Sequence, residues 1–394
     1  MSTTTGAPAP LRVAVVGCGV IGRLHAEVAA RSADLDVVAL VDPHDERTAA
    51  VSDELVAAGS RAPRRFAALA DALAAGGIDV VSVCTPSGEH AALALEALEA
   101  GAHVVVEKPL DVAIEPARRL RDAAAARPGQ VVAVISQHRH DESALAVRRA
   151  VDAGRLGRLT SAVANVDWYR TQEYYDSGEW RGTWALDGGG ALMNQGVHTL
   201  DLLLWFLGEP VEVVAYTARL GHERIEVEDV AVAIVRFASG ALATLHASTT
   251  VYPDLGVRLQ VHGTDGSAVI EADELTFFHA RDAEDGDWKA NQAAEEVGGG
   301  ATGSVRGALD PQESHVAQYG SSHDAQWADV VGAVREGRAP WVTLDDGLRA
   351  LATVRAVYLS ATLGEPVRVA DVVDGRYDGV ATRTGASERV GTSA

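Results

Sequence analysis

A lysine in this sequence has the chemistry and the surroundings of a proton-transfer group. Lysine is rare here. The sequence has 34 lysines and arginines in total, and only Lys108 and Lys289 are lysines. Lys108 stands in Glu107-Lys108-Pro109, directly after the apolar run Val104–Val106. Arginine keeps its proton near neutral pH, whereas a lysine in a partly dry site can lose it. An amine at this position therefore favours an acid–base role over a surface ion pair.

A second candidate group is a histidine that follows a glycine run. The segment begins with Gly188–Gly190, which lets the backbone lie against a ligand and opens a helix. Asn194 and His198 are then spaced to share one helical face, with Asp201 on the same side. A neutral imidazole near a substrate hydroxyl is a suitable general base. The alternative is a core histidine whose imidazole is satisfied by Asp201.

A glycine-rich motif directly follows the first apolar run, Leu11–Val16, and precedes a helical pattern. Gly17 permits a tight turn, Gly19 lets the backbone approach a pyrophosphate, and Gly22 lets helix and strand pack closely. The helix N-terminus offers unpaired amides and partial positive charge to a diphosphate. The sequence therefore predicts a dinucleotide site, with diphosphate contacts at Gly17, Gly19, Val20, Ile21 and Gly22.

The end of the next apolar run, Val37–Val41, indicates which dinucleotide is bound. Asp42 follows this run, twenty residues beyond Gly22, where a carboxylate accepts hydrogen bonds from the adenosine ribose. A carboxylate there repels a 2′-phosphate, so NAD is favoured over NADP. Arg47 is within reach of a 2′-phosphate, but we interpret it as a solvated helix charge.

Further cofactor contacts are predicted at the carboxyl ends of the apolar runs, where open α/β sheets bind ligands. Pro86 ends the run Val80–Cys84, and the Thr85 hydroxyl can bond a ribose or phosphate. His90, at the start of the next helix, is interpreted as a cofactor contact, with helix capping or packing as the alternative. The remaining predicted cofactor contacts are Glu107, Lys108 and Gln137.

Aromatic side chains gather upstream of the glycine run in a chain that is only 5% aromatic. Aromatic faces with interspersed hydrogen-bonding groups suit the apolar faces and hydroxyl rims of sugars. Core packing is the alternative for at least half of these side chains, which lie in 168–170, 174–175 and 180–184. The predicted substrate contacts are Lys108, Tyr169, Arg170, Tyr175, Asn194 and His198.

Two different patterns of secondary structure must position these groups. From Leu11 to about Ala133, short β-branched runs alternate with Ala-rich helical stretches, which predicts a Rossmann domain with a doubly wound parallel sheet. After Gln137, alternating strand patterns predict an α+β domain with a large, mostly antiparallel sheet and one free face. The predicted domains are 1–137 for NAD and 138–378 for substrate and oligomerisation, with an irregular excursion over 282–320 and a disordered tail over 379–394.

Composition excludes several functional classes. The formal charge of −21 disfavours nucleic acid and anionic membranes, both of which bind through lysine and arginine. No apolar run reaches the roughly 18 residues that cross a bilayer, and the first ten residues do not resemble a signal peptide. Two cysteines, Cys18 and Cys84, form neither a disulfide framework nor a zinc cluster. We therefore predict a cytoplasmic protein with no metal.

Taken together, these motifs resemble the family of glucose–fructose oxidoreductase and inositol 2-dehydrogenase, the Gfo/Idh/MocA family. The resemblance covers about Leu11 to Val369 and is most specific in Glu107-Lys108-Pro109 after the dinucleotide motif. It also rests on Thr85-Pro86 with His90, Gly188–Asp201, 228–237, Gly240 and 263–267.

The resemblance implies hydride transfer between a substrate carbinol carbon and nicotinamide, with Lys108 and His198 assisting proton movement. It also implies a homodimer or homotetramer formed through the C-terminal sheet. Many members carry an aspartate where this chain has Asn194, and an amide cannot stabilise an imidazolium as a carboxylate would. This raises the weight on Lys108 as proton acceptor and leaves Asn194 to orient a substrate hydroxyl.

We therefore expect an NAD-dependent oxidoreductase of a sugar or cyclitol. One alternative is an enzyme that retains NAD and oxidises then re-reduces its sugar, giving epimerisation, transfer or glycosidic cleavage without net redox. The other is a non-catalytic NAD-binding sensor or scaffold, against which the presence of both Lys108 and His198 argues.

Overall fold

The computed structural model describes residues 8–281 and 320–384, which form two compact units. The first contains residues 8–137, 180–188 and 320–352, and the second contains 138–179, 189–281 and 353–384. Residues 180–188 and 320–352, which are expected in the C-terminal domain, group with the first unit. The expected irregular excursion lies outside the described residues except for Gly320.

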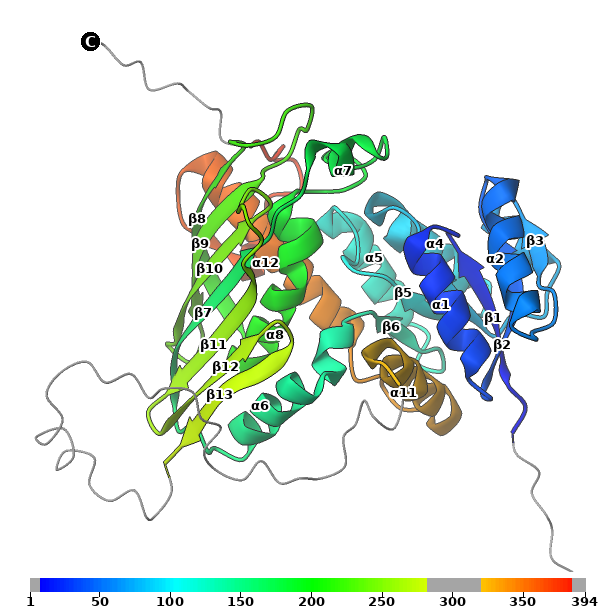
Figure 1. The fold of residues 1–394 in the computed structure, drawn as a ribbon, viewed down its shortest axis with the longest axis horizontal. Helices are drawn as coiled ribbons and strands as arrows, with labels where there is room; N and C mark the ends of the chain where they lie inside the picture. The colour runs from blue at the N-terminus through cyan, green and yellow to red at the C-terminus, as the bar shows by residue number, and fades with distance from the viewer. Residues whose placement is uncertain (1–7, 282–319, 385–394) are drawn as a thin grey trace, which may run out of the picture. The chain divides into compact units, whose positions relative to one another are not determined.

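The first unit is built on a parallel six-stranded sheet with the strand order β3-β2-β1-β4-β5-β6 (Figure 1). This order reverses between β1 and β4, and doubly wound sheets bind dinucleotides at such a switch point. The predicted Rossmann fold is thus confirmed. The strands are β1 Leu11–Val16, β2 Leu35–Val41, β3 Arg64–Phe66, β4 Val80–Val83, β5 His103–Val106 and β6 Val132–Val134.

Helices cover both faces of this sheet, as its buried strands require. The core includes the buried side chains of Val13, Leu40, Val80 and Val105. Trp327, from a helix late in the sequence, joins the same core, which explains why the segment around it groups with the first unit. The helices are α1 Val20–Arg31, α2 Asp45–Ala57, α3 Leu69–Ala74, α4 His90–Glu99, α5 Ile114–Ala125, α11 Ser322–Glu336 and the first part of α12 Leu344–Leu363.

The second unit contains an eight-stranded sheet with the order β13-β12-β11-β7-β10-β9-β8-β14. Only β7 and β10 pair in parallel, and the other neighbours are antiparallel. This confirms the large, mostly antiparallel sheet. The strands are β7 Leu159–Asp167, β8 Pro210–Ala218, β9 Val230–Phe237, β10 Leu242–Ser248, β11 Gly256–Gly263, β12 Gly266–Glu271, β13 Glu274–Ala280 and β14 Val367–Arg368.

One face of the large sheet packs against helices of the same unit. Figure 1 shows α8 and α12 beside this sheet. The opposite face exposes apolar side chains, since alternate residues of β8 to β10 point outward. These exposed side chains are Val214, Tyr216, Val232, Ile234 and Leu242. The other elements of this unit are α6 Glu142–Asp152, α7 Gln172–Asp176, η3 Ala191–Gly196, α8 Val197–Leu207 and α13 Val369–Val373.

The described part of the predicted disordered tail is held by hydrogen bonds. The Arg383 amide donates to the Thr362 hydroxyl at 3.0 Å, and the Thr384 hydroxyl donates to the Glu226 carbonyl at 2.6 Å. The disorder of the tail stays a prediction, and 385–394 lie outside the described residues. Among the described helices, none combines the length and the apolar character that a bilayer crossing requires.

Candidate functional site

The three glycines of the dinucleotide motif have the geometry that their predicted roles require. Gly17 has a φ of +87°, and a Cβ there would lie 2.6 Å from the carbonyl oxygen of Cys84. A Cβ on Gly22 would lie 1.7 Å from the carbonyl oxygen of Gly17, so helix and turn are in direct contact. A Cβ on Gly19 would meet nothing within 4 Å. The open space at Gly19 is where the backbone of such a motif approaches a pyrophosphate.

The N-terminus of α1 adds unpaired donors to this open space. Gly19 is the N-cap and offers no side-chain hydrogen bond to the first turn. Val20 is 84% exposed, and Ile21 is also exposed, so the first turn is uncovered by the described residues. Free amides at a helix N-terminus attract anions. These residues fit a diphosphate.

Asp42 lies at the end of β2, as predicted for a group that recognises the adenosine ribose. Its carboxylate is buried and accepts hydrogen bonds from the amides of Cys18 and His44, both at 2.9 Å. Each oxygen retains a lone pair for a ribose hydroxyl. Arg47 lies 3.8 Å from the carboxylate, nitrogen to oxygen, and so is an ion-pair partner as well as a half-exposed helix charge.

Two predicted cofactor contacts carry buried polar atoms that have no hydrogen-bond partner among the described residues. They are the Thr85 hydroxyl oxygen, after β4, and the side-chain oxygen of Gln137, after β6. A buried polar atom left unpaired costs about 1–3 kcal/mol, so its partner is expected to be a ligand or water. Ribose hydroxyls and a carboxamide supply such partners. Pro86 lies between Thr85 and the short turn η1 Ser87–Glu89.

His90 holds the backbone, which corrects its interpretation as a cofactor contact. Its imidazole is 1% exposed, and its two nitrogens lie 2.7 Å from the carbonyl oxygen of Pro109 and 2.8 Å from that of Thr85. Both nitrogens thus face backbone carbonyl oxygens, as the packing alternative expects. It connects the loop after β4 to the Glu107-Lys108-Pro109 turn after β5.

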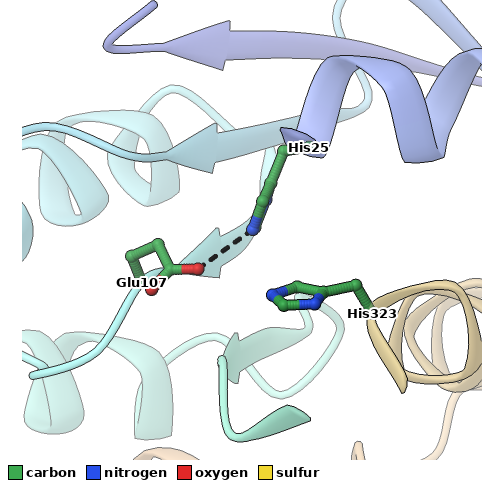
Figure 2. Close-up of side chains that lie close together, drawn as sticks. All are labelled: His25, Glu107 and His323. Carbon is green, nitrogen blue, oxygen red and sulfur yellow. Dashed lines mark hydrogen bonds and ion pairs between the residues drawn. The ribbon is translucent and has the colours of Figure 1, made fainter. Parts of the chain in front are cut away.

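Glu107 points away from the surface into a cluster of histidines (Figure 2). One carboxylate oxygen lies 3.0 Å from Nε2 of His25 on α1, and the other accepts the Lys108 amide at 3.1 Å. His323, from α11, lies beside this pair with its ring 5.9 Å from that of His25. Glu107 and His25 are both buried, so Glu107 holds the Glu107-Lys108-Pro109 turn from the interior of the first unit.

The contact between His25 and Glu107 raises the pKa of the imidazole and lowers the pKa of the carboxyl group. Burial lowers the pKa of His25, but Cys84 and Glu107 outweigh it and raise that pKa to about 10. Burial raises the pKa of Glu107, but His25 and Lys108 outweigh it and lower that pKa to about 2. His25 was missed from the sequence, although its position three residues after Gly22 on α1 is a recognisable signal.

Lys108 is half-buried and is joined to Pro109 by a cis peptide bond. Burial lowers the pKa of its amine, while the negative charges of Glu107 and Asp187 oppose that effect. Asp187 is itself buried and accepts the Gly182 amide at 2.8 Å. The sequence analysis did not single out Asp187, although it directly precedes the glycine run. A desolvated amine near two carboxylates is suited to proton transfer.

The segment after the glycine run is a π-helical turn, η3, and only then an α-helix, α8. Glu228 anchors this turn because its carboxylate accepts the amides of Gly190 and Leu192, both at 2.9 Å, and the Tyr358 hydroxyl at 3.0 Å. Asn194 lies inside the wider turn. The Asn194 amide donates to the Gly190 carbonyl at 3.1 Å, and the shared face of Asn194 and His198 stays a prediction.

His198, in the first turn of α8, is half-buried and lies against another histidine. Its ring centroid is 5.1 Å from that of His138, with the rings nearly perpendicular. Asp201 binds Arg139 through two hydrogen bonds of 2.7 and 2.6 Å, and both residues are buried. Arg139 is thus a partner of both carboxylate oxygens of Asp201.

The predicted aromatic substrate contacts separate into exposed and buried groups. Tyr169 is exposed and packs edge-on against Tyr252 at 5.0 Å. Arg170 lies over the ring of Trp168 at 4.6 Å. Tyr175 is 4% exposed and its hydroxyl lies 2.9 Å from that of Thr249, which fits the alternative of core packing.

Two clusters in the described residues have the composition of a metal site, although the sequence analysis predicts no metal. His25, Glu107 and His323 form one, and His138, Asp141 and Asp273 form the other. In each cluster an imidazole nitrogen already lies within hydrogen-bonding distance of a carboxylate oxygen. The absence of a metal stays a prediction.

Two family models match adjoining parts of the chain. Residues 11–145 match the oxidoreductase family with an NAD-binding Rossmann fold, and residues 144–269 match the GFO/IDH/MocA C-terminal domain. The break between the two matches lies near the boundary between the two units at Gln137.

Known proteins with similar sequences span most of this chain. It is 28% identical to the scyllo-inositol 2-dehydrogenase (NADP(+)) of Bacillus subtilis, over 72% of this chain and 77% of that protein. It is also 28% identical to the 1,5-anhydro-D-fructose reductase of Ensifer adhaerens, over 91% of this chain and 98% of that protein.

A solved structure supports the same relationship over nearly its whole length. The WlbA dehydrogenase of Bordetella pertussis, in complex with NADH and UDP-GlcNAcA, is 31% identical with a TM-score of 0.76. The match covers 91% of this chain and 98% of that chain, so both units are included.

Proposed function

The chain belongs to the Gfo/Idh/MocA family of NAD-binding oxidoreductases, and on this premise we propose that it moves a hydride between a sugar or cyclitol carbon and nicotinamide. Its cofactor is NAD. When bound, NAD accepts or returns the hydride at the nicotinamide ring. The polyol class is supported by relatives named as inositol, anhydro-sugar and glucoside dehydrogenases or reductases.

Lys108 is the proposed proton acceptor when the substrate is oxidised. Its half-buried amine has a lowered pKa and stands directly after β5, at the carboxyl edge of the parallel sheet. This is the observation that carries the proposal, because a neutral amine can take the hydroxyl proton as the carbonyl forms. In the reverse direction the ammonium returns the proton to the carbonyl oxygen.

His198 and Asn194 are also proposed to contact the substrate. The imidazole is half-buried and can hold or pass the hydroxyl proton, and the Asn194 amide can orient a neighbouring hydroxyl. Tyr169 and Arg170 are proposed to line the substrate site, since Tyr169 is exposed and both lie on the segment after β7.

A lysine variant tests the proposed function. We expect K108A to lower kcat by about a thousandfold on the best polyol substrate, within the usual range for a lost acid–base group, while the Kd for NAD changes little. The matched control is K289A, since Lys289 is the only other lysine in the sequence. Near-normal turnover by K108A would refute the assignment.

The same assay separates the alternatives. Sugars, inositols and sugar acids are screened for nicotinamide reduction with NAD and NADP side by side. Isomerised or cleaved product, bound nicotinamide and no NADH accumulation would indicate an enzyme without net redox. NAD binding with no turnover across the whole panel would indicate a sensor.

We also propose that copies of this chain associate through the outer face of the large sheet, in the cytoplasm. Cross-strand pairs such as Tyr216 with Val232 and Val214 with Ile234 place apolar side chains next to one another on that face. Contiguous exposed apolar surface is typical of an interface. The net charge of −21 does not favour nucleic acid as a partner.

A further inference from the structure

The segment after β7 carries an arginine whose backbone is fixed on both sides. The Arg170 amide donates to the Thr249 carbonyl at 2.9 Å. Its own carbonyl oxygen lies 2.9 Å from Nε2 of His222, a buried imidazole whose other nitrogen lies 3.2 Å from the Asp229 carboxylate. Because the backbone is already held, less conformational freedom is lost when the side chain binds a ligand.

Two aromatic rings hold the guanidinium group of Arg170. Its central carbon lies 4.6 Å from the centroid of the Trp168 ring and 5.3 Å from that of the Tyr174 ring. Stacking covers the faces of a guanidinium plane and leaves the N–H groups at its edge available. The Tyr169 carbonyl oxygen accepts one of these groups, from Nη1 at 3.2 Å.

The other two nitrogens of this guanidinium have no acceptor among the described residues. Nε is buried and makes no hydrogen bond, and Nη2 makes none to residues 8–281 or 320–384. No carboxylate in these ranges forms an ion pair with Arg170, although the chain has 55 Asp and Glu against 34 Lys and Arg. A buried donor of a charged group is costly to leave unpaired, so its acceptor is expected to be a ligand or water.

Other arginines of the chain show what this pair of nitrogens binds. Nε and Nη2 of Arg139 donate to the two carboxylate oxygens of Asp201 at 2.7 and 2.6 Å. The same two nitrogens of Arg12 donate to the carboxylate of Asp79 at 2.9 and 2.7 Å. Such a fork matches the spacing of the oxygens in a carboxylate or a phosphate. In Arg170 this fork has no such partner from the described part of the chain.

Contacts connect Arg170 to the segment that follows the glycine run. The Gln195 side chain, on η3, donates to the Tyr174 hydroxyl at 3.3 Å, and the Tyr174 ring packs against Arg170. The side-chain oxygen of Gln195 is buried and has no hydrogen-bond partner among the described residues. An unpaired donor and an unpaired acceptor thus occur in one set of contacts, directly before and after Tyr174, and Gln195 adjoins Asn194 in the sequence.

We propose that Arg170 is a specificity-determining residue that binds an anionic group of the substrate, a carboxylate or a phosphate ester, through Nε and Nη2. The preferred substrates are then sugar acids or sugar phosphates. A net charge of −21 repels anions in general, so a local cation without a carboxylate partner is the feature that admits one. This inference rests on the proposed function as a polyol oxidoreductase and on the place of Arg170 in the substrate site.

Matched pairs of substrates test the proposal. Each pair joins a neutral sugar to a charged counterpart: D-glucose with D-glucuronate, D-galactose with D-galacturonate, and D-glucose with D-glucose 6-phosphate. In at least one pair, kcat/KM for NAD reduction should be about a hundredfold higher for the charged member, as expected for hydrogen bonds to a charged group. Preference for a uronate would identify a carboxylate as the bound group, and preference for the 6-phosphate would identify a phosphate.

Two variants of Arg170 separate charge from geometry. R170Q should lower the ratio of the charged to the neutral kcat/KM by about a hundredfold, mainly through KM. R170K keeps the charge but cannot form two parallel hydrogen bonds, so it should lower the ratio by about tenfold. A merely structural role of Arg170 would lower both values together and leave the ratio unchanged, which would overturn the proposal.

Arg376 supplies the matched control. It also lies over a tyrosine ring, with the Tyr377 centroid at 5.9 Å, but Nη1 already donates to the carboxylate of Asp371 at 2.9 Å. R376Q therefore removes a stacked arginine whose charge is paired, and it should keep the wild-type ratio.

Calorimetry keeps this test separate from the proposed function because it needs no turnover. The NAD-loaded protein should bind the charged member of the preferred pair about a hundredfold more tightly than the neutral one, and R170Q should lose this difference. If no sugar is oxidised but the difference is present, the proposed function fails and the role of Arg170 stands. If neutral sugars are oxidised and no charged member binds or reacts better, the inference alone fails. If neither oxidation nor a difference in binding is found, both fail.

Discussion

The buried pair of His25 and Glu107 predicts a measurable dependence of stability on pH. Replacing His25 by glutamine keeps a side chain of similar reach that can still donate to Glu107 but cannot carry charge. The imidazole is fully buried and Glu107 nearly so, so water cannot take over its role. We expect the variant to fold with a weakened first unit and a less well fixed Lys108.

The magnitude follows from the change in pKa of the carboxyl group. The raised pKa of His25 also reflects the neighbouring Cys84, so the pKa of Glu107, which falls from 4.5 to about 2, is used to set the scale. At 1.36 kcal/mol for each pKa unit this fall corresponds to about 3 kcal/mol, of which His25 supplies the largest part and Lys108 a smaller one. This agrees with the roughly 3–5 kcal/mol lost when one partner of a buried ion pair is removed.

The sign of the pH dependence differs for the two groups. The pKa of His25 is raised, so its contribution is complete below about pH 6.5 and is lost as the pH rises towards 10. The pKa of Glu107 is lowered, so its contribution is complete above about pH 4.5 and is lost as the pH falls towards 2. The pair therefore stabilises the first unit most between about pH 4.5 and 6.5.

Urea unfolding at pH 7, 8 and 9 tests this reasoning. Over this range the wild type should lose about 1.4 kcal/mol more for each pH unit than H25Q, since His25 stays protonated only in the folded state. The matched control is H246Q, which removes a partly exposed histidine paired with Asp167. Parallel curves for the wild type and H25Q would show that His25 is neutral in the fold and would refute the ion pair.

Three other predictions concern the cofactor site and the sheet face. Gly22→Ala should destabilise the first unit by about 3 kcal/mol, because its Cβ would lie 1.7 Å from a backbone oxygen. Gly19→Ala should leave urea unfolding unchanged, since its Cβ would meet nothing, but should weaken NAD binding at least tenfold by calorimetry. Asp42→Ala should shift the ratio of NADP to NAD affinity upward by at least tenfold, since Arg47 remains nearby; an unchanged ratio would contradict the assigned role. If the proposed association through the sheet face is correct, Ile234→Asp should give a monomer in sedimentation experiments without changing the fold.

The parallel sheet and its glycine turn were predictable because they depend on local pattern. Buried parallel strands are continuous apolar runs, and β1, β2, β4, β5 and β6 all correspond to such runs in the sequence. The strand β3 was missed because it is short, at the edge, and carries two exposed arginines. The strands β13 and β14 were missed as well, and β14 has only two residues.

The polar contacts were less predictable because they join residues that are far apart in sequence. The partner of Glu107 comes from α1, and the buried residues that place α11 in the first unit lie near residue 330. No local pattern shows that His90 will bridge two carbonyl groups or that Tyr175 will be buried. Residue type indicated where chemistry was available, but the pairing of these groups depends on tertiary packing.

The glycine run is held by a residue that lies far from it in the sequence. Glu228 is fully buried, and its carboxylate accepts two amides at the start of η3, so the backbone there is set by a residue from the segment before β9. A Cβ on Gly190 would lie 1.7 Å from the Glu228 carbonyl oxygen, which explains the glycine at this position. Burial of Glu228 against the glycine run thus fixes where the segment that carries Asn194 and His198 begins.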